Sequence, residues 1–297
     1  MSERPAVLIA PGHGPHAGDG KEHEDVALHV HDVSRYYAGT KGRGHALDGV
    51  NLDVDCGEFV CVVGPSGCGK STLLDILAGH QQPDHGEVLA HGEIVSGPNR
   101  RRMVVFQEHA LFPWLNVIEN VSFGLRLAGH HANAANHIAQ EWLERVHLGN
   151  VANARIHELS GGMKQRVALA RALSLDPEVL LMDEPFAALD AQTRDHLHAE
   201  VQQLWQDTGK TIVFVTHNVR EAVVLGDRVV VMAANPGRLR AVVNVPLARP
   251  RLLEDPEVVA LARVVGQYLR DGTALDGEVF DATPRDEAPP AALPGMS

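Results

Sequence analysis

The feature that most constrains this chain is a glycine-rich segment, residues 64–72, whose spacing matches the pattern G-x-x-x-x-G-K-[ST]. It follows an apolar run, residues 59–63, and precedes a helical stretch, Leu73 to Ala78. Glycines in such a strand-loop-helix unit let backbone amides wrap around an anion, and the helix N-terminus favours negative charge. Lys70 can reach the β and γ phosphates, and the Ser71 hydroxyl can ligate Mg²⁺. The motif therefore predicts a site for a nucleoside triphosphate. The residues expected at the phosphates are Gly64, Pro65, Ser66, Gly67, Cys68, Gly69, Lys70, Ser71 and Thr72.

Cys68, inside this loop, allows two interpretations. Helix N-termini lower thiol pKa values, so a reactive thiol is one of them. The favoured interpretation is a small residue that fits the loop. The chain has three cysteines, Cys56, Cys61 and Cys68, an odd number close together in sequence. This pattern indicates reduced thiols rather than a disulfide framework.

Apolar runs alternate with helical stretches along the middle of the chain. This order favours an α/β fold with a largely parallel sheet covered on both faces. The expected core strands are Phe59 to Val63, Met103 to Phe106, Val179 to Met182, Thr211 to Val215 and Arg228 to Met232. Between the second and third of these, Val117 to Leu127 and His137 to Val146 have helical patterns. We therefore expect a small helical subdomain at about residues 108–160.

The two ends of the chain differ from this pattern. Residues 1–26 are rich in His, Gly and Pro, and residues 276–297 are rich in Pro, so both are expected to be disordered tails. A metal role for His13, His16 and His23 is not favoured, because their spacing is irregular. The main domain is expected at 27–245, followed by a C-terminal helical extension at 246–275.

Charge and hydropathy exclude several classes of function. A net charge of −12 argues against a general nucleic-acid binder, because affinity for phosphate backbones depends on clustered Lys and Arg. The chain has no apolar run of the roughly 20 residues that a membrane helix needs. The apolar stretch near the N-terminus, Ala6 to Ala10, is too short for a secretion signal. We expect the protein to remain in the cytoplasm.

Two carboxylates and a histidine follow apolar strands. Asp183 and Glu184 follow the run 179–182, and His217 follows the run 211–215 after Thr216. Ligands gather at the C-terminal ends of parallel strands, so these side chains are expected at one sheet edge. Asp183 suits a hold on Mg²⁺, and Glu184 is then placed to polarise an attacking water.

A second candidate anion site begins at Ser160-Gly161-Gly162, in a segment that leads into the helical run Val167 to Leu173. Exposed amides and the helix dipole at such an N-terminus favour phosphate. An N-capped helix after a glycine turn explains the same residues equally well.

In combination, these motifs resemble the ABC ATPase family over residues 27–245. The matching elements, in order, are an adenine-stacking aromatic at Tyr37, the phosphate loop Gly64 to Thr72, Gln107, the signature Leu159 to Gln165, the pair Asp183 and Glu184, the segment Ala188-Leu189-Asp190, and the switch histidine His217. Tyr36 neighbours Tyr37 and is the alternative for stacking on adenine. The resemblance implies a P-loop NTPase core, an antiparallel β subdomain and an inserted helical subdomain.

The resemblance also implies how the chain works. Two such chains form a homodimer, and each ATP lies between the phosphate loop of one chain and the signature of the other. Glu184, His217, Gln107 and Lys70 would be catalytic. Ser71, Gln107 and Asp183 would hold Mg²⁺, and Ser160, Gly161, Gly162, Gln165 and Asp190 would complete the nucleotide site. Residues 111–114, Leu-Phe-Pro-Trp, lie where an integral-membrane permease is usually received, although ordinary packing explains them equally well.

Finer similarity is to importers of the nitrate, sulfonate and taurine group, carried most specifically by residues 183–194. It implies uptake of a small anion through a separate permease, served indirectly by a periplasmic or extracellular solute-binding protein, with this chain peripheral at the cytoplasmic face of the inner membrane. Two positions depart from the usual pattern, Ala187 and Asn218, and neither removes a catalytic group. The alternative is a soluble ABC ATPase with a non-transport role.

Overall fold

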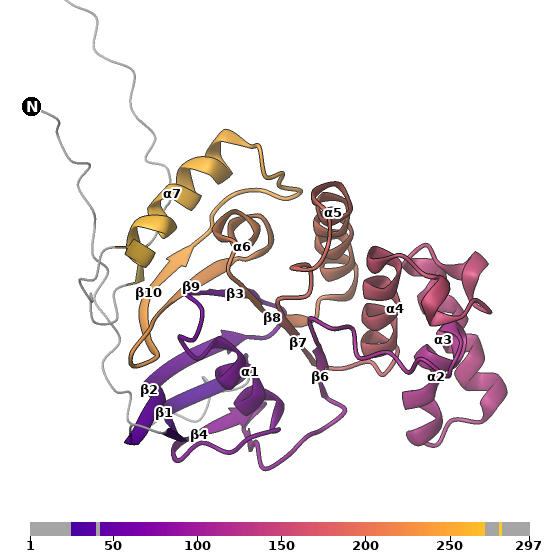
Figure 1. Ribbon diagram of the computed structural model, residues 1–297, viewed down its shortest axis with the longest axis horizontal. Helices are drawn as coiled ribbons and strands as arrows, with labels where there is room; N and C mark the ends of the chain where they lie inside the picture. Colours follow the sequence, from indigo (N-terminus) through magenta and orange to yellow (C-terminus); the bar gives the residue numbers. More distant parts are fainter. Residues whose placement is uncertain (1–24, 40–41, 271–278, 281–297) are drawn as a thin grey trace, which may run out of the picture.

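The computed structural model describes residues 25–39, 42–270 and 279–280. The expected tails, 1–26 and 276–297, lie outside these residues except at 25–26 and 279–280. Two sheets and three groups of helices make up the described part (Figure 1).

The larger sheet has seven strands and carries most of the candidate site. Its order is β11 (Val279–Phe280), β10 (Arg238–Asn244), β9 (Arg228–Ala233), β3 (Phe59–Val63), β8 (Thr211–Thr216), β7 (Val179–Asp183) and β6 (Arg102–Val105). The neighbours from β9 to β6 all run parallel, whereas β10 pairs with β9 antiparallel. The expected mainly parallel sheet is therefore confirmed.

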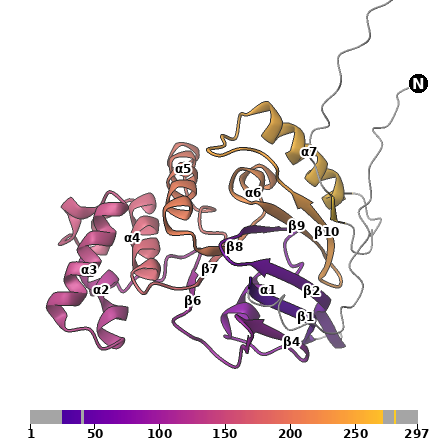
Figure 2. The same ribbon diagram turned by 180° about the vertical axis from the view of Figure 1, so that it is seen from behind.

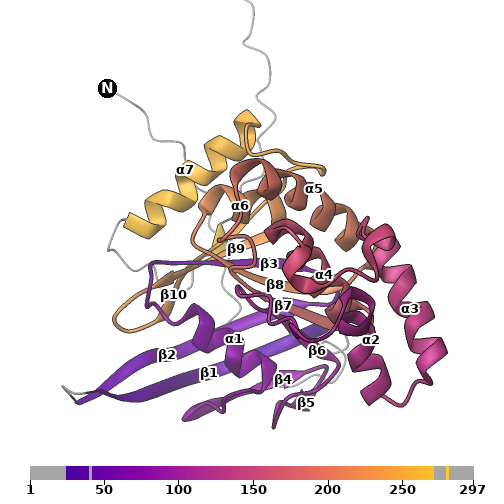
Figure 3. The same cartoon turned by 45° about the vertical axis from the view of Figure 1, so that its right-hand side comes forward.

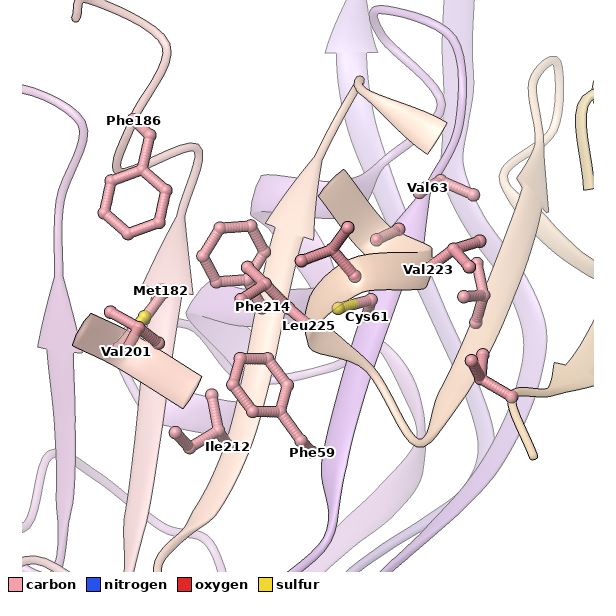
Figure 4. Packing of buried hydrophobic residues seen from close by; sticks show 14 of the residues in the cluster. Phe59, Cys61, Val63, Met182, Phe186, Val201, Ile212, Phe214, Val223 and Leu225 are labelled. Carbon is pink, nitrogen blue, oxygen red and sulfur yellow. The ribbon is translucent and has the colours of Figure 1, made fainter. Parts of the chain in front are cut away.

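The alternation of side chains along each central strand explains why the sheet is buried on both faces. In β3, Phe59, Cys61 and Val63 belong to one core cluster, while Val60 and Val62 belong to another. The first cluster lies between the sheet and helices, where Phe59, Phe214 and Phe186 gather beside Val201 and Leu225 (Figure 4). A strand with apolar side chains on both faces is stable only between two layers.

Different layers cover the two faces. Helices α5 (Ala191–Thr208), α6 (Val219–Leu225) and α7 (Pro256–Arg270) lie on one side of the sheet (Figures 1 and 2). Helix α1 (Lys70–Ala78) lies on the other side, next to the antiparallel sheet. That smaller sheet has the order β2 (Gly42–Asp55), β1 (Val26–Gly39), β4 (His85–Ala90) and β5 (Glu93–Ile94).

A group of helices is inserted between β6 and β7, and Figure 3 shows it beside the strands. It comprises α2 (Val117–Leu127), α3 (Ala132–Arg145), α4 (Gly161–Leu173) and the short 3-10 turns η1 (Gly149–Val151) and η2 (Ile156–Glu158). Its core is separate from those of the sheet and includes Val121, Leu143 and Val167. Helix α2 begins at a capping box in which Asn116 and Glu119 bond each other's backbone amides.

Three helices begin before the ranges expected from the sequence. Helix α4 begins at Gly161, ahead of the expected run from Val167. Helix α3 begins five residues before His137, because its buried face starts with the small residues Ala135 and Ala139, whose apolar signal is weak. Helix α1 begins at Lys70, inside the phosphate loop. In the expected C-terminal extension, α7 spans Pro256–Arg270. Among the described residues, none of the helices has the length and apolar character needed to cross a bilayer.

Candidate nucleotide site

The phosphate loop runs from the end of β3 into α1, and close backbone packing fixes its shape. Gly69 has φ 96°, and a Cβ there would lie 2.5 Å from the carbonyl oxygen of Ala46. Gly237, between β9 and β10, packs against the carbonyls of Ala46 and Cys68 so closely that a Cβ would clash with both. Only glycine fits at these two positions, so the loop is clamped from two sides.

Lys70 is buried, with 6% of its surface exposed. Its Nζ donates hydrogen bonds to the carbonyls of Gly64, at 2.9 Å, and Pro65, at 3.2 Å. These bonds hold the ammonium group inside the loop, next to the backbone that the motif assigns to phosphate. The geometry fits a point charge facing a phosphate chain.

Cys68 has a buried side chain, and burial raises the pKa of its thiol. Its Sγ occupies the space that a Cβ on Gly64 would need. A buried thiol with a raised pKa is a poor nucleophile, so the geometry supports the interpretation of Cys68 as a small residue that fits. All three cysteines are free.

The hydroxyl of Ser71 and the carboxylate of Asp183 meet at the C-terminal ends of β3 and β7. Ser71 Oγ donates to Asp183 Oδ1 at 3.2 Å. Burial raises the pKa of Asp183, although the Ser71 hydrogen bond opposes this shift. Hydroxyl and carboxylate oxygens are the ligands that Mg²⁺ prefers, so the two side chains fit that ion.

Glu184 and His217 form the second pair at this edge. Glu184 Oε2 lies 2.8 Å from His217 Nδ1, and the Glu184 amide donates to the carbonyl of Val215 at 2.9 Å. Glu184 has φ 43°, a left-handed conformation that costs energy in a residue with a side chain and that clusters at functional sites. The turn carries the Glu184 side chain to His217, whose imidazole is 61% exposed. A carboxylate held in this way can orient a water molecule.

Gln107 and Tyr37 lie at the margins of this arrangement. Gln107 follows β6 at the same end of the sheet as Asp183, and its side chain is exposed. Tyr37, near the end of β1, is 41% exposed, and its hydroxyl donates to Gln81. The Arg35 guanidinium lies 5.4 Å from the Tyr37 ring centroid. Tyr36 instead packs edge-on against His45.

The signature forms the start of α4. Ser160 is the N-cap, and its Oγ accepts a hydrogen bond from the amide of Met163 at 3.3 Å. The same hydroxyl is on an exposed residue at a helix N-terminus, so capping and anion binding are compatible. Gln165 is fully buried, and neither of its amide atoms has a partner in the described part of the chain. A contact between its side chain and nucleotide would require the start of the helix to rearrange.

The segment after Glu184 packs on the signature within one chain. A Cβ on Gly161 would lie 3.1 Å from Leu189, and one on Gly162 would lie 2.5 Å from the methyl group of Thr193. Asp190 is the N-cap of α5 and accepts from the Thr193 amide at 2.9 Å, a hydrogen bond that lowers the pKa of the Asp190 carboxyl. The helix starts of α4 and α5 are therefore mutually supported.

The signature and the phosphate loop of one chain do not adjoin. Figures 1 and 2 draw α1 beneath the large sheet and α4 within the inserted helical group, apart from each other. Asp183, Glu184 and His217, in contrast, gather at the sheet edge next to the loop.

Sequence analysis did not single out two residues that support the site. Thr193 touches the signature glycine, and its sequence signal is only the Asp-x-x-Thr spacing of a helix cap. Glu221 is a buried carboxylate in α6, and its signal is a charge directly before the apolar run Ala222 to Leu225.

Comparison with known proteins extends over most of the chain. Residues 47–187 match the family described as ABC transporter. The chain is 48% identical over 246 residues to an uncharacterized ABC transporter ATP-binding protein of Methanocaldococcus jannaschii, covering 83% of this chain and 92% of the relative. It is 41% identical over 283 residues to a bicarbonate transport ATP-binding protein of Synechococcus elongatus, covering 93% and 98%. A taurine import ATP-binding protein of Burkholderia thailandensis is 48% identical over 222 residues, covering 75% and 85%.

A solved structure with the same architecture supports the family match. A dimeric ATP-binding cassette in a post-hydrolysis state, bound to ADP and Pi, has a TM-score of 0.66 and 31% sequence identity, covering 74% of this chain and 100% of that one. The family match, the relatives aligned over nearly their full length and the shared architecture agree with the motifs at the sheet edge. The chain belongs to the ABC transporter family, as one of its ATP-binding and ATP-hydrolysing proteins.

Proposed function

We propose that this chain hydrolyses Mg-ATP as a head-to-tail homodimer and thereby powers uptake of a small anion through a separate permease. The observation that carries the proposal is the division of the site: Ser71, Asp183, Glu184 and His217 assemble beside the phosphate loop, whereas Ser160 lies apart on α4. Because the sheet-edge residues and the signature lie apart in one chain, a complete nucleotide site needs the signature of a second chain.

Each residue at the sheet edge has a role that its position supports. Lys70 and the loop amides hold the β and γ phosphates, and Ser71, Asp183 and Gln107 hold Mg²⁺. The metal would neutralise charge on the phosphate oxygens. Glu184 accepts a proton from the attacking water, and His217 keeps the carboxylate aimed at that water. Tyr37 stacks on adenine.

The dimer arrangement follows from the signature. Ser160 and Gly161 are exposed and present the N-terminus of α4 to solvent, with Gly162 buried behind them. A helix N-terminus favours the γ phosphate of an ATP held by another chain. Asp190 stands beside them at the start of α5 and would line the same interface. The structurally similar cassette is itself a dimer bound to ADP and Pi.

A permease is the expected partner on the helical side. A cavity of about 570 Å³ there is lined by Phe106, Phe112, Phe123 and Arg171, among others, and Trp114 nearby is 69% exposed. An apolar hollow with aromatic and arginine side chains suits a helical segment of a membrane protein. The chain would then sit peripherally at the cytoplasmic face of the membrane. Trp114→Asp should release the full chain from membranes of its own cells while leaving ATP binding unchanged.

The transported solute is proposed as a class. The relatives transport bicarbonate and import taurine, according to their names. Both solutes are small and carry an acidic group, so we propose a small anion such as nitrate, a sulfonate, taurine or bicarbonate. A solute-binding protein outside the membrane would deliver it to the permease.

Complementation between two inactive variants tests the dimeric site. Lys70→Ala removes the phosphate half, and Ser160→Arg removes the signature half. A mixed dimer then contains one intact site, so an equal mixture should recover up to about a quarter of wild-type hydrolysis if the sites act independently. Each variant alone stays inactive. Absence of recovery in mixed dimers shown to form would contradict head-to-tail sites.

A further inference from the structure

A chain of buried polar side chains lies behind His217. Thr216, 2% exposed, is the last residue of β8 and directly precedes the histidine. Its Oγ1 donates to Glu221 Oε2 and accepts from the amide of Asn218 at 3.0 Å. The Thr216 hydroxyl therefore links the residue before His217, Thr216, to the residue after it, Asn218.

The chain continues from α6 into α5. The other oxygen of Glu221, Oε1, lies 2.7 Å from His198 Nε2, and both side chains are buried, with 5% and 3% exposed. Because the carboxylate only accepts, the network places the Nε2 proton on His198. We name Thr216, Glu221 and His198 the buried polar chain.

The far end of this chain touches a second segment of the site. The His198 ring packs edge-on against Phe186, with centroids 5.6 Å apart, and Phe186 follows Glu184 by two residues. His198 lies in α5, whose N-cap is Asp190. The buried polar chain thus joins the segments that carry Glu184, His217 and Asp190.

The packing of the core does not by itself require the Glu221 carboxylate and the His198 imidazole at these positions. The surrounding cluster includes Phe186, Leu197, Val201, Phe214 and Val223, most of them labelled in Figure 4. Burying a carboxylate and an imidazole in such a place costs free energy that the hydrogen bonds only partly offset, and apolar residues of similar volume often stabilise a protein as well. In addition, His198 Nδ1 has no hydrogen-bond partner among the described residues, and its nearest carboxylate oxygen, on Asp195, is 4.0 Å away.

We propose that Glu221 and His198 are positioning residues for hydrolysis, which hold His217 against Glu184 and tie that geometry to the start of α5. The proposal rests on the hydrolytic role assigned above to Glu184. Thr216 transmits the constraint, because its hydroxyl fixes the backbone on both sides of His217. A movement of α5 at the dimer interface would then reach the His217 side chain through two hydrogen bonds.

Hydroxyl removal at Thr216 is the first test. Thr216→Val keeps the shape of the side chain and breaks the buried polar chain at its nearest bond, whereas Thr216→Ser restores the hydroxyl. Displacement of a positioned group by about 1 Å can cost up to 100-fold in rate, so we expect kcat to fall about 10- to 100-fold in the valine variant. The serine variant should recover most of this loss, and the Kd for Mg-ATP should stay within about twofold in both.

His198→Leu tests the distant end against a matched control. The control is Gln202→Leu, one turn along α5, where a side chain 2% exposed bonds the backbone of Arg251 and, at 3.5 Å, the backbone carbonyl of His198. Within the described residues it forms no hydrogen bond with the side chains of the buried polar chain. Both variants lose buried hydrogen bonds and should lower Tm. Only His198→Leu should also lower kcat, measured well below either Tm. Equal kcat values in the two variants would overturn the proposal.

The His217→Ala background separates positioning from simple loss of structure. If His198 acts through His217, adding His198→Leu to His217→Ala should lower Tm further but leave the residual kcat unchanged. Independent, multiplied losses of kcat would contradict the proposal. A wild-type protein without ATPase activity, or a Glu184→Gln variant with full activity, would instead overturn the proposed function.

Discussion

The sheet-edge half of the proposed nucleotide site and its signature half are built in different ways. At the sheet edge, Asp183 and His217 come from the ends of different strands and Ser71 comes from the start of α1, and the sheet fixes how these segments are spaced. At the signature, Ser160 and its glycines come from one helix start, which packs on Leu189 and Thr193. The sheet edge therefore brings reactive side chains together within one chain, whereas the start of α4 exposes a surface that a second chain can contact.

This difference teaches where each half is vulnerable. A change at the sheet edge should alter chemistry or nucleotide affinity and leave the dimer surface intact. A change at the signature should alter how two chains meet while each chain still binds nucleotide. The four predictions below test this division.

Glu184→Gln should have the largest effect, on hydrolysis alone. The amide keeps the side chain's shape and one oxygen but removes the base, and general-base loss typically costs 10²- to 10⁴-fold, so we expect kcat to fall about 10³-fold. Binding should persist, because the role that we propose for Glu184 is to activate water and not to hold phosphate. ATP trapped between two chains should then keep them together.

Light scattering during gel filtration checks this consequence. The Glu184→Gln variant should elute as a dimer in Mg-ATP and as a monomer in ADP. Wild-type hydrolysis in this variant would mean that Glu184 is not the catalytic carboxylate, and Gln107 and Asp190 would become the candidates for positioning water.

Lys70→Ala should have the next largest effect, on affinity. Its buried ammonium is the charge that we propose faces the β and γ phosphates, so its loss should weaken Mg-ATP binding about 100-fold, as for other desolvated charged hydrogen bonds. Calorimetric titration measures this directly. The matched control is Lys210→Ala, which removes a lysine paired with Asp176 on the surface and should leave affinity unchanged. Wild-type affinity in Lys70→Ala would contradict the phosphate-loop assignment.

Sequence alone predicted that Asp183, Glu184 and His217 meet at one sheet edge, because the signals for this are local. The loop spacing and the apolar runs before Asp183, Glu184 and His217 are contiguous in the chain, and parallel strands bring such ends together. Local signals do not give the order β3-β8-β7, the left-handed φ of Glu184 or the burial of the Cys68 thiol. These depend on tertiary packing.

The supporting residues were harder to predict for the same reason. Thr216, Glu221 and His198 lie on three elements, and nothing local marks them as partners. The burial of Gln165 is likewise invisible in a motif that reads as polar. The helical pattern of α2 was predicted with its full range because its apolar residues are large, whereas the small residues of α3 hid its first turn.

Gly162→Ala tests the signature half through its packing. The added Cβ would lie 2.5 Å from the Thr193 methyl group, and overpacking of this kind costs about 1–3 kcal/mol. We expect a lower Tm and lower hydrolysis at fixed protein concentration, with nucleotide binding to the separate chain retained. Thr193→Ser removes the methyl group, so the double variant should recover Tm. A double variant no more stable than Gly162→Ala would show that the contact with Thr193 is not the cause.

Substitution of Asp190 should have the smallest effect, a change in Tm. It tests whether the N-cap of α5 supports the signature half. The Thr193 amide lowers the pKa of the Asp190 carboxyl in the folded chain below its unfolded value of about 3.9. The ionised cap therefore contributes stability above that value, and the contribution is lost as pH falls through the folded pKa.

Asparagine caps as well as aspartate but does not titrate, so Asp190→Asn should match the wild-type Tm near pH 7. Below about pH 4 the wild type should lose Tm relative to Asp190→Asn, while Asp190→Ala should be lower by roughly 2 to 4 °C at neutral pH. Thermal unfolding of the three proteins from pH 7 to pH 3 measures these differences, and other titrating groups cancel between them. A constant gap between wild type and Asp190→Asn at every pH would mean that the carboxylate is not held by the Thr193 amide, and the start of α5 would then depend on its packing against Gly161 and Gly162 instead.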